Sequence, residues 1–214
     1  MTCINWRGRI LDRLAGTKPS HDAAHSRIAG VSSKYDAMFR EMYPDTAVPA
    51  AVLVPIIERE SGCTVLLTVR ATGMRRHAGQ IAFPGGRIED TDADPAAAAQ
   101  REAWEEIGLP SEHCTVVGYL PDHLVFTGYR VTPVVALVRP GFTLKYDPGE
   151  VADSFEVPVS HLFDPVNHGF RKGSVRGRAI ELHEIPFQNR AVWGATAGML
   201  INLYQVVCGE ADAA

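Results

Sequence analysis

The stretch FPGGRIEDTDADPAAAAQREAWEEIGL, Phe83–Leu109, joins a glycine turn to the clearest helical pattern in the chain. Asp94 and Pro95 make a favourable helix start, because an aspartate side chain accepts hydrogen bonds from exposed backbone N–H groups and proline fits the first turn. Four alanines follow, which form helices readily, and Gly108 is a natural stop. The sequence therefore predicts a helix over residues 94–108 that is entered through a loop.

Three glutamates of this helix, Glu102, Glu105 and Glu106, stand at i, i+3 and i+4 and so share one face. Neighbouring carboxylates repel, and the helix dipole disfavours anions toward the C-terminal end. Arg101 can reach Glu105 at i+4, and a divalent cation would relieve the rest of the repulsion. Mg²⁺ and Mn²⁺ prefer carboxylate oxygens. The spacing alone leaves a solvated acidic helix face open as the alternative.

The segment that begins at Gly86 resembles the Nudix box, in which a glycine, five residues, a glutamate and seven residues precede Arg-Glu-aliphatic-x-Glu-Glu-x-Gly-aliphatic. Its core, REAWEEIGL at 101–109, is intact. Asp92 replaces the first glutamate, eight residues in place of seven separate it from this core, and Ala103 is smaller than the usual aliphatic residue. The resemblance implies a Nudix-type α-β-α sandwich around a mixed sheet, in the α/β (α+β) class. It also implies a metal-dependent diphosphatase.

The preceding segment, LLTVRATGMRRHAGQIAFPGG at 66–86, is similar to a narrower signature found upstream of the box in coenzyme A diphosphatases of that family. This similarity implies cleavage of coenzyme A or its derivatives to 3′,5′-ADP and (acyl-)4′-phosphopantetheine. Several basic side chains fall near the box, and arginine suits phosphate recognition. A structural hydrogen bond is an equally open role for His77, as is a backbone cap for Gln80. The residues expected to bind substrate are Arg70, Arg75, His77, Gln80, Gly85 and Gly86.

The resemblance also assigns roles within the box. Glu102, Glu105 and Glu106 would hold Mg²⁺ or Mn²⁺, which neutralises charge on the diphosphate and lowers the pKa of the attacking water. The general base is open between Glu105 and Glu150, because family members often use a glutamate from a later loop. Arg101 is expected to orient the glutamates as an ion-pair partner.

The rest of the chain divides into a helical, polar extension at 1–45, which lies outside the resemblance, and the Nudix hydrolase domain at 46–214. Short apolar runs predict strands, and an apolar stretch at 193–207 predicts a closing helix. This helix and Trp193 are read as core in preference to a pantetheine groove, and the basic stretch 170–178 as a solvated hairpin in preference to an adenine site. The predicted strands are 50–57, 63–69, 115–120, 130–138 and 178–185.

Bulk properties exclude several partners. The net charge of −4 disfavours nucleic-acid binding, and no apolar run reaches the ~20 residues that a membrane span needs. Four scattered cysteines are typical of reduced thiols in a cytoplasmic protein. The expected partner is therefore a small-molecule substrate, and a homodimer is possible. The competing functions are hydrolysis of another nucleoside diphosphate derivative, such as a nucleotide sugar or dinucleotide, and a non-catalytic nucleotide sensor.

Overall fold

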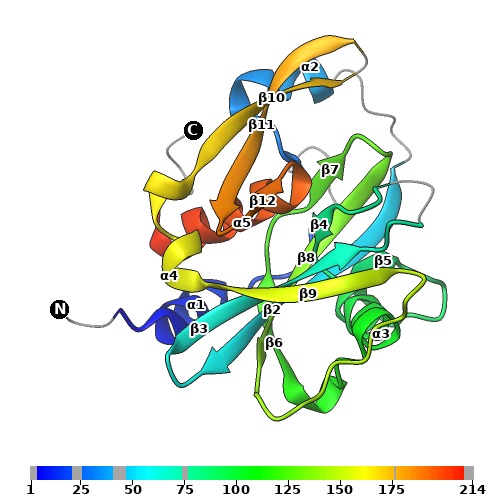
Figure 1. The fold of residues 1–214 in the computed structure, drawn as a ribbon, viewed down its shortest axis with the longest axis vertical. Helices are drawn as coiled ribbons and strands as arrows, with labels where there is room; N and C mark the ends of the chain where they lie inside the picture. The colour runs from blue at the N-terminus through cyan, green and yellow to red at the C-terminus, as the bar shows by residue number, and fades with distance from the viewer. Residues whose placement is uncertain (1–3, 21–25, 41–46, 74–76, 176, 210–214) are drawn as a thin grey trace.

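The computed structural model describes residues 4–20, 26–40, 47–73, 77–175 and 177–209. Within these residues, a nine-stranded mixed sheet has the order β1-β7-β8-β2-β3-β4, with β5 paired to β2, β6 to β8 and β9 to β3 (Figure 1). Its strands are β1 (Arg27–Ile28), β2 (Val48–Arg59), β3 (Gly62–Arg70), β4 (Ile81–Ala82), β5 (Gly85–Arg87), β6 (Cys114–Tyr119), β7 (His123–Val125), β8 (Tyr129–Val138) and β9 (Val151–Pro158).

Strand β2 lies at the centre of this sheet, parallel to β8 and antiparallel to β3. Alternate β2 residues enter two separate apolar cores, because successive side chains point to opposite faces of a strand. Val54 and Ile56 belong to one core, whereas Leu53 and Ile57 belong to the other. A strand buried on both faces reads as a continuous apolar run, which is why the sequence predicts it well.

Helix α3 (Pro95–Ile107) covers one face of the sheet and packs against β2, β5 and β8. Asp94 caps it by accepting a hydrogen bond from the Ala97 N–H at 2.8 Å, and Gly108 ends it with φ of 65°. The small Ala103 is buried against the sheet within this face's core. The predicted start and stop of this helix are confirmed.

The opposite face is covered by α1 (Trp6–Leu14), α5 (Ala195–Cys208) and the short α4 (Val159–Leu162). Helix α1 packs against α5 and β6, and Ile10 and Leu14 are fully buried there. Together with α3 this completes the α-β-α layering, and the predicted fold class is confirmed.

A second, three-stranded sheet has the order β10-β11-β12 and stands beside the main sheet (Figure 1). The sequence predicts only β11 among these strands. Helix α5 begins at Ala195, two residues after the predicted start of the closing helix, because Trp193 belongs to β12. Within the described residues, no helix combines the length and apolarity that a membrane span requires. The strands are β10 (Gly169–Val175), β11 (Arg178–Phe187) and β12 (Arg190–Trp193).

The N-terminal segment is helical only in part. Besides α1, it contains the 3-10 turn η2 (Ser33–Tyr35) and the short α2 (Asp36–Arg40), and two further 3-10 turns, η3 (Ser111–His113) and η4 (Pro165–Asn167), lie later in the chain. Residues 27–28 form β1, which pairs with β7 in parallel, so the expectation of helix is wrong there. A two-residue strand has too little pattern to be recognised from sequence, since its conformation comes from its neighbour.

Candidate active site

Arg101 connects the loop before α3 to the glutamates of that helix. Its Nε and Nη2 donate to the two carboxylate oxygens of Asp92, each at 3.0 Å. Its Nη1 donates to Glu102 at 2.9 Å and to Glu105 at 3.0 Å, and Nη2 also donates to the Arg87 carbonyl at 3.1 Å. The hydrogen bond from Arg101 holds the pKa of Asp92 below its usual value. The extra residue in the loop thus leaves the Asp92–Arg101 pair intact.

Glu106 lies on the inner side of the same helix and is 3% exposed. Its pKa is raised to about 8, mainly by burial. The charge of Arg70 opposes this rise, the charges of Glu150 and Glu102 contribute to it, and the Gly85 backbone N–H opposes it slightly. The Arg70 Nη1 atom is 4.0 Å from the Glu106 carboxylate. A buried carboxyl with so little compensating charge is a position that a cation would stabilise.

Glu102 faces the glycine turn, where β5 runs between β2 and α3. A Cβ atom on Gly86 would lie 2.5 Å from the Glu102 Oε1 atom, so only glycine lets the backbone approach this carboxylate. Gly85 has φ of 155°, and a Cβ there would lie 2.4 Å from the Ala51 carbonyl oxygen. Burial raises the pKa of Glu102, although Arg101 opposes the shift.

The loop before β9 docks on the C-terminal turn of α3 and carries Glu150 to the site. The Asp147 N–H donates to the Glu106 carbonyl at 2.9 Å, and the Lys145 N–H donates to the Ile107 carbonyl at 2.9 Å. The Glu150 carbonyl in turn accepts from the Ala71 N–H at 2.8 Å. Glu150 is exposed, and its charge raises the pKa of both Glu102 and Glu106, so it lies near these two box carboxylates.

Glu105 differs from the other two box glutamates in its exposure, since its side chain is 55% exposed, and like Glu102 it pairs with Arg101. Within the described residues, no three acidic, histidine or cysteine side chains already converge tightly enough to hold an ion. The side-chain atoms near Glu106 that could bind a cation are nonetheless carboxylate oxygens, and the basic group beside them is Arg70. This donor set fits a hard divalent cation such as Mg²⁺ or Mn²⁺, which would offset the mutual repulsion of the carboxylates.

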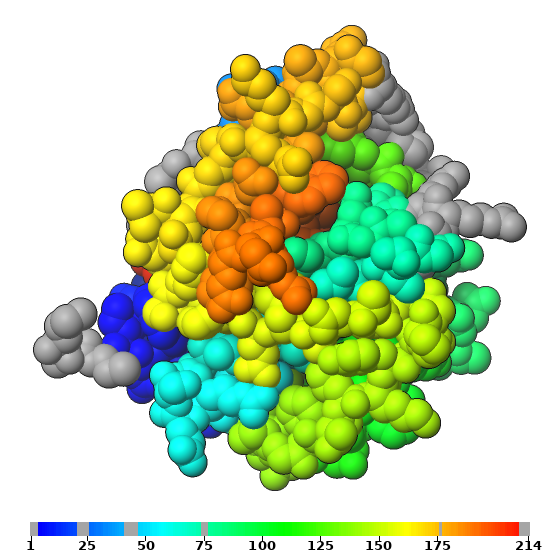
Figure 2. Space-filling model, in the orientation of Figure 1, coloured from blue at the N-terminus to red at the C-terminus, as the bar shows by residue number. Residues whose placement is uncertain are grey.

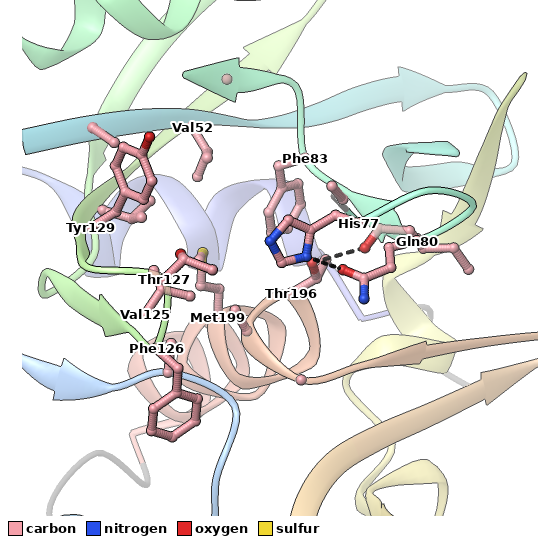
Figure 3. Close-up of a pocket in the computed structure, with 18 of the residues that line it drawn as sticks. Val52, His77, Gln80, Phe83, Val125, Phe126, Thr127, Tyr129, Thr196 and Met199 are labelled. Atoms are coloured by element: carbon pink, nitrogen blue, oxygen red, sulfur yellow. Dashed lines mark hydrogen bonds between the residues drawn. The ribbon is translucent and has the colours of Figure 1, made fainter. Parts of the chain in front are cut away.

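A cavity of about 790 Å³ adjoins the glycine turn (Figure 3). Of the residues expected to bind substrate, five line it: Arg70, His77, Gln80, Gly85 and Gly86. Arg75, the sixth, lies outside the described residues. The His77 Nδ1 atom is hydrogen-bonded to the Gln80 Oε1 atom at 2.7 Å, and His77 has φ of 61°, a backbone conformation that is rare outside glycine.

The cavity also involves segments that sequence reasoning did not assign to a site. The turn between β7 and β8 contributes Thr127, and the start of α5 contributes Thr196 and Met199. The core role expected for α5 is confirmed by the fully buried Leu200 and Leu203, but residues in its first turns also line the cavity. Apolar lining residues give no sequence signal that separates them from core residues.

The basic stretch at 170–178 forms the β10–β11 hairpin. Arg171 is 3.5 Å from the Glu184 carboxylate and lies over the Trp193 ring at 4.9 Å. Trp193 and Val175 line the cavity. Figure 2 shows the surface hollowed between the orange second sheet and the teal segment around β4.

Comparison with known proteins agrees with this geometry. The family model described as the NUDIX domain matches residues 47–175. The protein named "Uncharacterized Nudix hydrolase NudL" from Cronobacter sakazakii is 43% identical over 155 residues, which cover 72% of this chain and 80% of the relative. The protein of the same name from Escherichia coli K12 is 42% identical over 159 residues, with the same coverage.

Among solved structures, the Nudix hydrolase RenU from M. smegmatis superposes with a TM-score of 0.52 and 21% identity. The match covers 78% of this chain and 96% of RenU. At this level of identity the likeness concerns the fold alone.

Proposed function

Because the chain belongs to the Nudix hydrolase family, we propose that it cleaves the diphosphate of coenzyme A or its derivatives. Members of the family hydrolyse phosphorus-containing anhydrides with the help of divalent cations, so a hydrolase of a diphosphate-containing small molecule is the premise. The products would be 3′,5′-ADP and (acyl-)4′-phosphopantetheine.

One observation carries the choice of coenzyme A. Described residues of the segment 66–86, which is similar to the coenzyme A diphosphatase signature, line the cavity, among them Arg70, His77 and Gly85. Its Arg70 contacts Glu106 of the box, and the Nε atom of Arg70 is buried without a hydrogen-bond partner in the described structure. A phosphate oxygen would satisfy that donor while Arg70 keeps its contact with Glu106.

Glu102 and Glu106 are the residues that we propose hold Mg²⁺ or Mn²⁺, and Glu105 joins them if it leaves Arg101. The bound cation would neutralise charge on the diphosphate and acidify the attacking water. Arg101 orients Glu102 and Glu105 through its hydrogen bonds. Gly86 lets the backbone of β5 lie directly against the Glu102 carboxylate, where a Cβ atom would collide with it.

Glu150 is favoured over Glu105 as the general base, because its turn is held against both α3 and the end of β3. In the proposed step a water attacks one phosphorus, the Glu150 carboxylate takes the water proton, and the bond to the bridging oxygen breaks. Glu105 is held by Arg101 in an exposed ion pair, which lowers its availability as a base.

The function is tested by comparing the hydrolysis of coenzyme A, ADP-ribose and diadenosine polyphosphates with Mg²⁺ and with Mn²⁺, with products identified by mass. Metal-dependent release of 3′,5′-ADP, with coenzyme A well ahead, is the expected result. Preferred cleavage of another substrate would establish the nucleotide-sugar or dinucleotide alternative. Binding of these compounds without cleavage of any of them would establish a sensor.

The base is tested with Glu150→Gln, which should lower kcat by about 10²–10⁴. Glu105→Gln should lower kcat less, because we expect that Glu105 contributes to catalysis only if it binds the cation. Glu112→Gln, at the exposed turn after α3, is the matched control and should keep full activity. A larger loss in Glu105→Gln than in Glu150→Gln would assign the base to the box.

A further inference from the structure

Residues 27–32 of the N-terminal segment are hydrogen-bonded to both sheets. The first two of them form β1, which pairs in parallel with β7 of the main sheet. The next ones run beside β11 of the second sheet, where the His183 N–H donates to the Gly30 carbonyl at 2.9 Å. The Ser32 N–H donates to the Glu181 carbonyl of the same strand at 3.3 Å. The second sheet stands beside the main sheet (Figure 1), and this segment connects the two.

Side chains of the N-terminal segment also fill a small apolar core between the two sheets. Ile28, Val31 and Phe39 pack there with Leu124 of β7 and Ile180 of β11. This core is separate from the two that cover the faces of the main sheet. Because protein interiors are close-packed, the volume of these side chains sets the distance between β7 and β11.

Three partly buried side chains connect this small core to the cavity beside the glycine turn. Phe126, Val175 and Leu182 pack against the core, and all three also line the cavity. The Phe39 ring packs on the Phe126 ring, with the two centroids 4.5 Å apart. Ala29 lines the cavity directly. The N-terminal segment therefore supports one wall of the cavity and forms part of it.

At Gly30 the segment crosses the start of α5 in direct backbone contact. Gly30 has φ of 78°, and a Cβ atom there would overlap the backbone of Gly194 and Ala195. From the other side, a Cβ atom on Gly198 would lie 2.6 Å from the Gly30 N atom. Gly194 and Ala195 line the cavity, so a change in this contact moves atoms of the cavity wall.

Another attachment of the second sheet lies in contact with water. Arg190 of β12 donates to Asp153 of β9 at 2.7 Å, and the two side chains are 30% and 49% exposed. Ion pairs with this exposure contribute little to the free energy of folding. Of these two attachments, the buried contacts of residues 27–32 are therefore the stronger restraint on the second sheet.

We infer that residues 27–32, which precede the matched family domain, position the cavity wall for the substrate, with Gly30 as the positioning residue. The inference rests on the proposed function in one respect, that the part of the substrate beyond the diphosphate occupies this cavity. The box glutamates lie on α3, which covers the opposite face of the main sheet from α5. Displacement of the segment should therefore weaken substrate binding and leave the chemical step intact.

Gly30→Ala and Gly198→Ala test this contact from its two sides, since each places a methyl group between the segment and α5. Gly198 lies inside α5, where alanine favours the helix more than glycine does, so this variant decides the test if Gly30→Ala does not fold. KM for coenzyme A should rise at least about fourfold in both variants, the factor that one lost methylene contact gives, while kcat stays within about twofold.

Gly16→Ala is the matched control for backbone strain. Gly16 has φ of 75°, close to that of Gly30, but a Cβ atom there meets nothing within 4 Å. Both of its kinetic constants should match the wild type. A purely structural loss would lower the fraction of active enzyme, which reduces the apparent kcat and leaves KM unchanged. Unchanged KM in Gly198→Ala and in folded Gly30→Ala would overturn the inference.

Amide hydrogen exchange follows the segment without a measurement of activity. In Gly198→Ala, the His183 amide, which donates to the Gly30 carbonyl, should exchange at least about tenfold faster than in the wild type. The Leu53 amide, which donates to the Pro84 carbonyl beside the glycine turn at 2.9 Å, should keep its rate. Equal acceleration at both amides would indicate a general loss of stability and would contradict the inference.

The choice of substrate separates this inference from the proposed function. If the wild type cleaves or only binds another diphosphate compound in place of coenzyme A, the proposed function fails. The same variants are then compared with that compound, through KM or through Kd. A rise in this constant in Gly198→Ala but not in Gly16→Ala supports the role of the segment, and an unchanged constant in both overturns it.

Discussion

At the scale of single residues, the site is built on a carboxyl group that the metal-free fold tolerates poorly. Glu106 is buried beside Glu102 and Glu150, with Arg70 as the compensating charge. Such a group does not favour stability, because a buried charge that lacks full pairing lowers the free energy of unfolding.

The pKa of Glu106 gives the sign of its effect on stability. Burial raises it from 4.5 to about 8, so between these pH values the folded protein holds a proton that the unfolded chain has released. Stability from this group is therefore present at low pH and is lost as the pH rises toward 8. We expect Glu106→Gln, which carries no charge, to remove this loss.

In a chelating buffer, the thermal unfolding midpoint of Glu106→Gln should exceed that of the wild type by an amount that grows from pH 5 to pH 8.5. A gain of about 2–4 °C corresponds to each kcal/mol for a chain of this size. The same variant should lose hydrolysis in the presence of Mg²⁺. Glu112→Gln should show neither effect, and a wild-type midpoint that stays above that of Glu106→Gln at pH 8.5 would contradict the account.

At the scale of elements, the site depends on how closely β5 approaches α3. The two meet at Gly86 and Glu102, because β5 is hydrogen-bonded to β2 on its other side and has no room to move away. Arg101, which directly precedes Glu102, donates hydrogen bonds to Asp92 and to the Arg87 carbonyl. These bonds hold the loop between β5 and α3 against this part of the helix.

Gly86→Ala should therefore displace the Glu102 carboxylate, since the new Cβ would lie 2.5 Å from Oε1. We expect kcat/KM to fall at least about tenfold, with a larger effect at low metal concentration, while circular dichroism shows a folded protein. Gly73→Ala is the control, because a Cβ there meets nothing within 4 Å. Equal activity of the two variants would show that the position of Glu102 is not critical.

At the scale of the whole molecule, the segment before residue 46 contributes to the same core as the catalytic domain. Ile10 and Leu14 of α1 are fully buried among residues of β2, β8 and α5, and β1 extends the main sheet beside β7. We propose that residues 1–45 are an extension outside the family's domain in sequence, although α1 and β1 within them pack with that domain. A homodimer and a cytoplasmic location stay predictions.

Ile10→Ala should lower the free energy of unfolding by about 2–5 kcal/mol, because it leaves a cavity in a packed core. Ile4→Ala, at a residue that is 52% exposed, should change it by less than about 0.5 kcal/mol. Denaturant titration of both variants measures the difference. A small effect of Ile10→Ala would mean that α1 is a loosely attached extension.

The sequence alone determined the features that arise from local patterns. Helix α3 could be predicted from its cap, its alanines and its final glycine, and β2 from its apolar run. The glutamate face and its pairing with Arg101 followed from helical spacing, because i, i+3 and i+4 positions meet in any α-helix.

Only the tertiary structure decided what those local features face. The glutamates differ because the sheet buries Glu106 and leaves Glu105 exposed, and Glu150 reaches them because a loop far along the chain docks on the end of α3. The cavity is likewise assembled from β2, the β7–β8 hairpin, the second sheet and α5. Contacts between such distant segments depend on strand order and packing, whereas local residue patterns encode only the conformation of each segment.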